Sequence, residues 1–278
     1  MPTAKINGID IYYEEHGDSN AEPVLLIMGF LMNAAAWAPQ VPALAERYHV
    51  IALDNRGAGR TTQPEAGYTM EDMADDAAGV LGHLGIDSAH VIGLSMGGMV
   101  AQHLALRHPR RVRTLTLMVT SCGGPHSAGY ETMVERRAEA QAQPPESLGA
   151  WTPEQAQEFA LMHFTPEFLA NPGPAFMQFV TAALQHPTLP HSMLAQGEAI
   201  LAHDTHDRLP EIAAPTLVMA GDADPLIDPE NSRILAKRIP GAQLRLFPGL
   251  RHGFSVERPD EVNAVVLEFL GKHAAVPA

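Results

Sequence analysis

The chain has 278 residues, of which 46% are hydrophobic, and a single cysteine, Cys122. That length fits one large domain or a core with an insertion, and one cysteine excludes an internal disulfide. A net charge of −14 and a pI near 5.4 argue against nucleic acid and anionic membrane surfaces as partners. The N-terminus has no apolar signal core, and no apolar run approaches the roughly 20 residues of a membrane span, so a cytoplasmic protein is expected.

Short apolar runs alternate with helical patterns in the first half of the chain. Asn7-Gly8 between two strand-like runs is a hairpin signal, and the apolar run 24–28 predicts a strand buried on both faces. Thr69, with Asp72 three residues later, predicts the start of a helix. In chain order we expect strands at 4–6, 9–15, 24–28, 49–53, 89–92 and 114–120, and helices at 37–47, 69–84 and 99–107. This alternation implies an α/β fold with a mostly parallel central sheet flanked by helices.

The pattern changes after about residue 123, where prolines punctuate a stretch without strand runs. Helical patterns occupy 127–143, 153–163, 174–184 and 192–203. Strands are again expected at 215–220 and 242–247, with helices beginning near Pro229 and Pro259. We therefore predict that 126–208 is an inserted helical lid, and that 1–125 and 209–278 together form the α/β core.

Gly93-Leu94-Ser95-Met96-Gly97 lies between the expected strand 89–92 and the helix that follows it. In a strand–turn–helix context, Gly-x-Ser-x-Gly is a nucleophile elbow, in which the serine occupies a sharp, strained turn. Glycines are needed where helix and strand approach closely. The free N–H groups at the start of the helix favour a developing negative charge. The motif therefore predicts that Ser95 is a nucleophile.

Two further loops carry the partners that such a serine needs. Asp222 and Asp224 follow one expected strand and His252 follows the next, at the carboxyl ends where open α/β sheets place their ligands. A histidine can take the serine proton and return it to the leaving group. A carboxylate fixes the imidazole tautomer and stabilises the imidazolium. The residues alone leave open which aspartate does so.

The elbow motif and these two loops make the chain resemble the α/β-hydrolase superfamily, in its lidded serine esterase branch. The resemblance rests on Gly93-Leu94-Ser95-Met96-Gly97-Gly98, on 54–60, on Gly221-Asp222-Ala223-Asp224 and on the loop that carries His252. It implies that the acid is Asp224, and Pro225 favours this choice because it restricts Asp224 to extended backbone.

The resemblance also implies an oxyanion hole built from the backbone N–H groups of Met96 and Phe30. Many relatives have His-Gly in the loop after the strand at 24–28, whereas this chain has Met28-Gly29. Gly29 therefore remains an alternative donor and a candidate substrate contact. Because the donor is a backbone group, the substitution should not abolish the hole.

The activity that the resemblance implies is hydrolysis of a carboxylic ester through an acyl-Ser95 intermediate, without a metal or organic cofactor. Enol-lactonases and polyketide methyl esterases look similar. Haloalkane dehalogenases and epoxide hydrolases do not, because their nucleophile is aspartate. A lactonase, a carbon–carbon bond hydrolase, a cofactor-free perhydrolase and a non-catalytic ligand-binding protein remain open. The expected partner is a small-molecule ester or lactone, and the expected state is a monomer or homodimer.

The remaining candidate residues are expected to line a pocket or to have structural roles. Phe164 and Phe179 are expected to line an apolar pocket under the lid. The run 203–207 contains two histidines and two aspartates, but no metal site is predicted there because no further ligand set accompanies it. Trp37 is predicted to be a core residue, Asp54 and Arg56 to hold loops together, and Cys122 to be a core or near-site thiol. His103 and His108 are predicted to be surface or packing residues.

Overall fold

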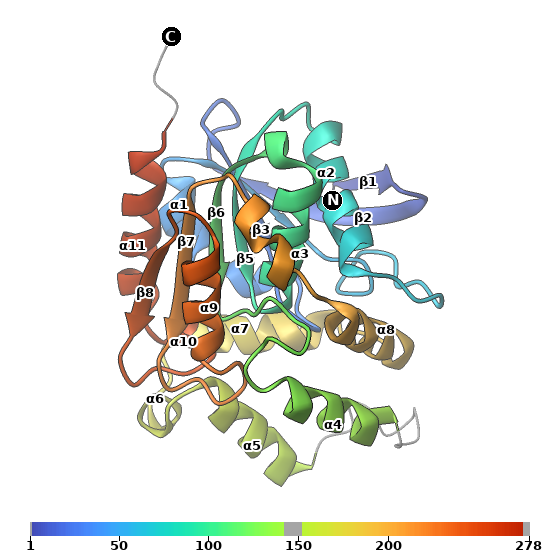
Figure 1. Ribbon diagram of the computed structural model, residues 1–278, viewed down its shortest axis with the longest axis vertical. Helices are drawn as coiled ribbons and strands as arrows, with labels where there is room; N and C mark the ends of the chain where they lie inside the picture. The colour runs from blue at the N-terminus through green and yellow to red at the C-terminus, as the bar shows by residue number, and fades with distance from the viewer. Residues whose placement is uncertain (1, 142–151, 275–278) are drawn as a thin grey trace.

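The computed structural model describes residues 2–141 and 152–274, and within them an eight-stranded sheet forms the centre of the fold (Figure 1). The strand order is β1-β2-β4-β3-β5-β6-β7-β8. The pairs β1–β2 and β2–β4 are antiparallel and the others are parallel, which confirms the predicted α/β class. The strands are β1 Thr3–Ile6, β2 Ile9–His16, β3 Pro23–Ile27, β4 His49–Leu53, β5 Ala89–Leu94, β6 Val112–Met118, β7 Thr216–Gly221 and β8 Gln243–Phe247.

Local sequence signals explain several of these elements. Asn7 and Gly8 join β1 to β2 with φ values of 50° and 83°, as a two-residue hairpin turn requires. Thr69 caps α2, and the capping box with Asp72 is present in full. The central strands β3 and β4 are buried almost throughout because helices cover both faces of the sheet.

The helices of the core differ from the sequence predictions in two places. Instead of one helix over 37–47, the chain forms a short 3₁₀ helix, η1, and then α1. Pro39 lies between them, and its missing N–H and fixed φ interrupt a helix. The helix after Ser95 begins at Met96, three residues earlier than expected. The core helices are η1 Ala34–Trp37, α1 Val41–Ala45, α2 Met70–His83, α3 Met96–Arg107, η2 Pro109–Arg111, η4 His206–Glu211, α9 Glu230–Arg238, α10 Phe254–Glu257 and α11 Pro259–Lys272.

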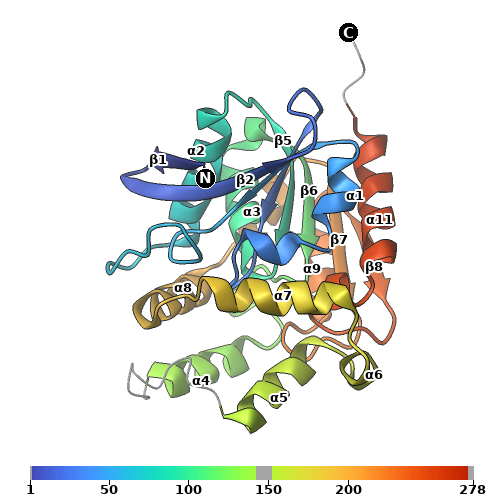
Figure 2. The same ribbon diagram turned by 180° about the vertical axis from the view of Figure 1, so that it is seen from behind.

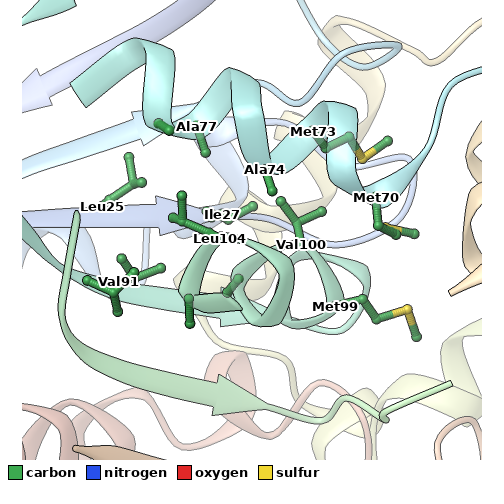
Figure 3. Close-up of a cluster of buried hydrophobic side chains, with 14 of the residues drawn as sticks. Leu25, Ile27, Met70, Met73, Ala74, Ala77, Val91, Met99, Val100 and Leu104 are labelled. Carbon is green, nitrogen blue, oxygen red and sulfur yellow. The ribbon is translucent and has the colours of Figure 1, made fainter. Parts of the chain in front are cut away.

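The packing of α2 and α3 on one face of the sheet forms the larger hydrophobic core (Figure 3). Met73 and Ala77 of α2 and Val100 of α3 face Ile27 and Val91 of the sheet. A second cluster on the other face surrounds Trp37, whose side chain is fully buried as predicted, and includes side chains of α11. The sheet is therefore covered on both faces, which holds its strand ends in fixed relative positions.

Between β6 and β7 the chain forms the helices α4 Tyr130–Gln141, α5 Pro153–His163, α6 Pro166–Ala170, α7 Pro174–Gln185 and α8 Pro190–Ala202. They gather at one end of the molecule, with α7 and α8 nearer the sheet than α4 and α5 (Figures 1 and 2). Helix α7 packs on η1 and on α10, which follow the carboxyl ends of β3 and β8. Residues 142–151 of the predicted lid lie outside the described residues. Among the described helices, none is long and apolar enough to cross a membrane.

The burial of β3 leads to a prediction about stability. Leu26 is fully buried at the centre of the sheet, whereas Leu244 on the edge strand β8 is 37% exposed. Leu26→Ala should lower the free energy of unfolding by about 2–5 kcal/mol, because it leaves a cavity in a packed core. Leu244→Ala should cost about 0.5 kcal/mol or less. Urea unfolding of both variants measures the difference, and equal losses would contradict this account of the core.

Candidate functional site

Ser95 lies at the turn between β5 and α3 in a backbone conformation that non-glycine residues avoid, with φ 56° and ψ −121°. Its N–H donates to the carbonyl of Met118 (2.8 Å), and its own carbonyl accepts from the N–H of Gly98 (2.8 Å) and the hydroxyl of Thr120 (2.7 Å). Such strain costs about 1–3 kcal/mol and persists where surrounding bonds hold it. This is the conformation of a nucleophile elbow.

The glycines of the motif are required by close packing. A Cβ on Gly97 would collide with the backbone carbonyl of Ile27 in β3, and one on Gly93 would collide with the carbonyl of Gly97. Both clashes are with backbone that cannot rotate away. The two glycines therefore allow α3 to begin directly above the strands, which brings the Ser95 turn against the loop after β3.

That loop contains the predicted oxyanion donors. A Cβ built on Gly29 would lie 3.1 Å from the Ser95 Cβ and 3.1 Å from the carbonyl of Leu94, so the loop and the elbow are in contact. Met96 is the first residue of α3. Within the described residues, neither the N–H of Phe30 nor that of Met96 donates to a protein acceptor. Unpaired N–H groups at these two positions are what an oxyanion hole requires.

Asp224 and His252 come together at the ends of β7 and β8. The His252 Nδ1 lies 2.7 Å from the Asp224 Oδ2, and both residues are buried. The other oxygen of Asp224 accepts from the N–H groups of Leu226 (2.8 Å) and Ile227 (3.1 Å). Because a carboxylate can only accept here, the Nδ1 of His252 carries the proton and its Nε2 is available as a base.

Asp222 points elsewhere. It is exposed, and its carboxylate accepts from the N–H of Gly249 (2.6 Å), which braces the turn before the histidine loop. Two aspartates separated by one residue thus have different surroundings, as expected for a turn.

Residues 161–165, at the end of α5, attach directly to the histidine loop. The carbonyl of His163 accepts from the N–H of Gly253 (2.6 Å), and the carbonyl of Leu161 accepts from the Arg251 guanidinium. Thr165 donates through its N–H and hydroxyl to the Glu257 carboxylate (3.1 and 2.6 Å). The predicted insertion therefore holds the segment that carries His252.

The two phenylalanines predicted to contact substrate occupy different environments. Phe164 is only 3% exposed, and a Cβ on Gly253 would collide with its ring, so the ring lies against the backbone beside His252. It also packs edge-on against Phe179, with ring centroids 5.9 Å apart. Phe179 is partly buried and packs against the core cluster around Trp37. Their contact with a substrate stays a prediction.

The ring of His163 packs edge-on against that of His252, with centroids 5.3 Å apart. Its Nδ1 lies 2.8 Å from the carbonyl of Phe159, which can only accept, so this nitrogen carries the proton. Burial, and then the nearby His252, lower the pKa of His163 to about 4. His163 therefore places a neutral ring beside the histidine of the site at neutral pH.

The loop after β4 supports the site without entering it. Asn55 donates to the carbonyl of Met28 (2.7 Å), and Asp54 accepts from the N–H of Ala34 (2.7 Å). Arg56 forms a bidentate pair with the buried Asp76 (2.6 and 2.7 Å). The loop-holding roles predicted for Asp54 and Arg56 are thus confirmed.

Comparison with known proteins agrees with this geometry. A family model described as the alpha/beta hydrolase fold matches residues 22–259. The chain belongs to the α/β-hydrolase family. A relative from Azorhizobium caulinodans, whose assigned name is that of a carbamate hydrolase, RutD, is 33% identical over 98% of this chain and 99% of its own.

Solved α/β-hydrolase structures of similar sequence superimpose on nearly the whole chain. The enol-lactonase from Burkholderia xenovorans LB400 gives a TM-score of 0.84 at 29% identity, covering 97% of this chain and 100% of that one. A thermophilic esterase from Thermogutta terrifontis gives 0.83 at 28% identity, covering 99% and 100%. The fold and the hydrolase family are therefore established, whereas the substrates that the names of these relatives indicate differ.

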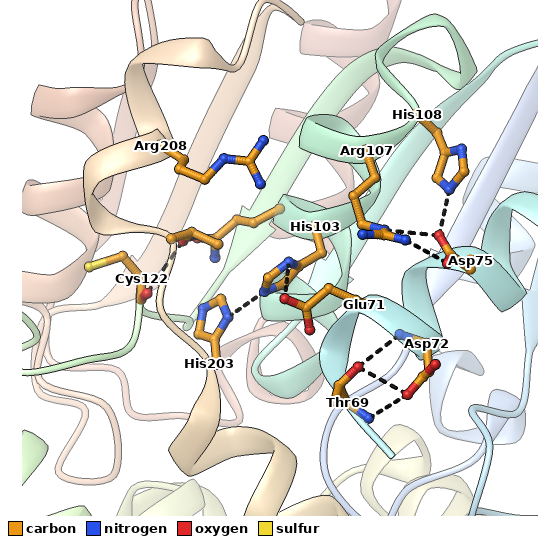
Figure 4. Close-up of polar contacts among 12 residues, drawn as sticks. Thr69, Glu71, Asp72, Asp75, His103, Arg107, His108, Cys122, His203 and Arg208 are labelled. Atoms are coloured by element: carbon orange, nitrogen blue, oxygen red, sulfur yellow. Dashed lines mark hydrogen bonds and ion pairs between the residues drawn. The ribbon is translucent and has the colours of Figure 1, made fainter.

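A polar network that the sequence did not predict links His103 of α3 to Glu71 of α2 and to His203 at the end of α8 (Figure 4). The Nε2 of His203 is 3.2 Å from the carbonyl of Ser121, and its Nδ1 is 3.0 Å from the Nε2 of His103. Since the carbonyl can only accept, His203 donates through Nε2 and accepts through Nδ1, and His103 donates through Nε2. The Nδ1 of His103 faces Glu71 at 3.4 Å. Burial, and then His103, lower the pKa of His203 to about 3.

Two other features lie outside this site. His126, His206 and Asp207 place three potential metal ligands within 4.8 Å of one another. The two rings stack 4.0 Å apart with planes 19° apart, so their in-plane lone pairs do not converge on one ion, and Arg238 lies 3.7 Å from Asp207. A surface hollow of about 320 Å³ lies between β8 and α11 and is lined partly by Leu244 and Lys272. It includes Gln243 at the amino end of β8, whereas His252 follows the carboxyl end of that strand.

The buried histidines lead to a prediction about pH. The folded-state pKa of His203 lies below the unfolded value of about 6.5, so the unfolded chain binds the proton first as pH falls. The contribution of neutral His203 to the free energy of unfolding should be present in full above pH 6.5. It should decline towards pH 3, by at most about 1.4 kcal/mol per pH unit. Burial lowers the pKa of His90 and His163 to about 4, which adds to the decline.

His203→Gln should be less stable than the wild type at pH 8, because the bond to His103 is weakened. Its stability should fall less steeply between pH 6.5 and 4.5, so the two curves converge. Urea unfolding across this range measures both slopes. Parallel curves would show that His203 is not a source of the pH dependence.

Proposed function

We propose that this protein is a serine hydrolase that cleaves an uncharged carboxylic ester through an acyl-Ser95 intermediate. The observation that carries the proposal is the pairing of His252 with Asp224 at 2.7 Å, at the same sheet edge as the strained Ser95 turn. This chemistry needs no metal or organic cofactor, since the three side chains supply the nucleophile, the base and the acid that orients it.

In the proposed reaction, His252 Nε2 accepts the Ser95 hydroxyl proton as the oxygen attacks the ester carbonyl carbon. The oxyanion of the tetrahedral intermediate is bound by the N–H groups of Met96 and Phe30. Collapse breaks the bond to the alcohol, which takes the proton from His252 and leaves an acyl-Ser95 ester. Water then repeats the sequence, with His252 as base, and releases the acid and free Ser95.

The residue types around Ser95 favour an uncharged, apolar substrate. The elbow 93–99 and the loop 28–34 contain no lysine or arginine, and the guanidinium of Arg251 donates to the carbonyl of Leu161. These segments therefore offer no positively charged side chain that could pair with a carboxylate on the substrate. We propose further that 126–208 acts as the cap over Ser95, with Phe164 and Phe179 on its substrate side. An enol-lactone and a carbon–carbon bond substrate use the same groups and belong in the same assay.

A carbamate is the second candidate substrate class. It is favoured by one observation, the 33% identity over nearly the full chain to a protein whose assigned name is that of a carbamate hydrolase. Attack by Ser95 on a carbamate carbonyl would need the same base and oxyanion donors. A panel of p-nitrophenyl esters of increasing acyl length, lactones and alkyl carbamates separates the two, because esters release acid whereas carbamates release an amine or ammonia.

Ser95→Ala should fold like the wild type and lose at least about three orders of magnitude in kcat on the best ester, because the nucleophile is gone. A serine-directed phosphonate should add one adduct to the wild type and none to the variant, as measured by mass spectrometry. Thr120→Ser, which keeps the hydroxyl that bonds to the Ser95 carbonyl, serves as the folded, active control. Labelling of another serine in the variant would refute the assignment.

The two aspartates of the turn provide a matched test of the acid. Asp224→Asn should lower kcat by about 10⁴, because an amide favours the wrong imidazole tautomer. Asp222→Asn, an identical change two residues away, should cost far less because its partner is the backbone of Gly249. Steady-state kinetics on one ester decide between them. A severe loss in Asp222→Asn beside a mild loss in Asp224→Asn would reverse the roles.

A further inference from the structure

The loop after β3 contains a residue in an unfavourable conformation next to the proposed oxyanion donor. Leu31 has φ 64°, in the left-handed region that costs a branched residue about 1–2 kcal/mol. The N–H of Met32 donates to the carbonyl of Gly29 (3.3 Å), so Phe30 and Leu31 are the central residues of a β-turn. The third position of such a turn with positive φ usually holds glycine. Something outside the turn must therefore hold Leu31.

Two side chains of the insertion bond to the backbone of Leu31, one on each side. The N–H of Leu31 donates to the Gln196 Oε1 (3.1 Å), and the carbonyl of Leu31 accepts from the Thr188 hydroxyl (3.1 Å). Gln196 is on α8 and Thr188 lies just before that helix. Their two bonds fix the peptide planes on both sides of the Leu31 Cα, and hence its backbone conformation.

Gln196 is itself held firmly. Its side chain is fully buried, and its amide NH₂ donates to the carbonyl of Arg56 (3.2 Å). Arg56 in turn is fixed by its bidentate pair with Asp76. The amide thus bridges the loops after β3 and β4, with its oxygen on one and its nitrogen on the other. This arrangement leaves only one orientation of the amide.

We infer that Gln196 and Thr188 are positioning residues for the oxyanion hole: they hold Leu31 at positive φ and so direct the Phe30 N–H towards the oxyanion at Ser95. Phe30 is bounded on one side by Gly29, which touches the elbow, and on the other by the fixed peptide plane of Leu31. Neither side chain touches the reacting atoms. The expected effect on kcat rests on the proposed function, whereas the expected effect on the backbone of Leu31 does not.

Gln196→Met and Thr188→Val are near-isosteric and remove these bonds. Each should lower kcat on an activated ester by about 10-fold to 100-fold with little change in KM, since loss of one whole oxyanion donor costs about 10²–10³. Thr188→Ser keeps the hydroxyl and should restore kcat.

The control is Gln63→Met. Gln63 also joins the core to the same part of the insertion, by accepting from the N–H of Leu189 (2.7 Å) and donating to the carbonyl of Pro187 (3.4 Å). Within the described residues, its side chain makes no hydrogen bond to Leu31. Gln63→Met should change stability without the selective loss of kcat. If it lowers kcat as much as Gln196→Met, the bonds merely anchor the insertion and the inference fails.

Hydrogen exchange of the amides in 28–34 provides a readout that does not depend on activity. Exchange should be faster in Gln196→Met than in Gln63→Met, because the bond of the Leu31 N–H is lost only in the first. Equal exchange in both variants overturns the inference even if the wild type is an active esterase. Faster exchange in a protein that neither hydrolyses esters nor labels at Ser95 supports the positioning of Leu31 and refutes the proposed function instead.

Discussion

The backbone turn at Ser95 joins β5 to α3 without an intervening loop, and the rest of the site is arranged around it. The turn is strained, yet three of its hydrogen bonds run to or from Met118, Thr120 and Gly98. Because Gly97 lies directly over the carbonyl of Ile27, the elbow is fixed against β3 as well as β6. These hydrogen bonds and the close packing of Gly97 therefore hold the Ser95 side chain, and the N–H of Met96, in one position relative to two neighbouring strands.

The loops after β3 and β8 are longer than this turn, and residues from distant parts of the chain hold them through hydrogen bonds. Asn55 and Asp54 fix the ends of the loop after β3, while Gln196 and Thr188 fix its middle. The segment 161–165 holds the histidine loop. The helices between β6 and β7 are thus attached to both halves of the site, which makes them part of its framework.

The features that could be predicted from the sequence are those with a local and specific signal. Asn7-Gly8, the Thr69 capping box and the elbow motif each force a backbone geometry by their own chemistry, and the structure contains all three. The prediction of one helix over 37–47 was wrong because Pro39 interrupts it between η1 and α1. The bond between Leu31 and Gln196 joins residues 165 positions apart. Glutamine carries no signal of its own for such a contact, so only the folded chain reveals it.

The way in which the insertion is attached bears on how specificity is set in this family. Three of its bonds to the loops of the site run to backbone atoms, namely the N–H and carbonyl of Leu31 and the N–H of Gly253. Backbone partners place no demand on the neighbouring side chains, so the framework can stay constant while apolar residues beside Ser95 change. An enol-lactonase and an esterase, which are 29% and 28% identical to this chain, share its fold, as expected if the substrate is selected by those side chains and not by the framework.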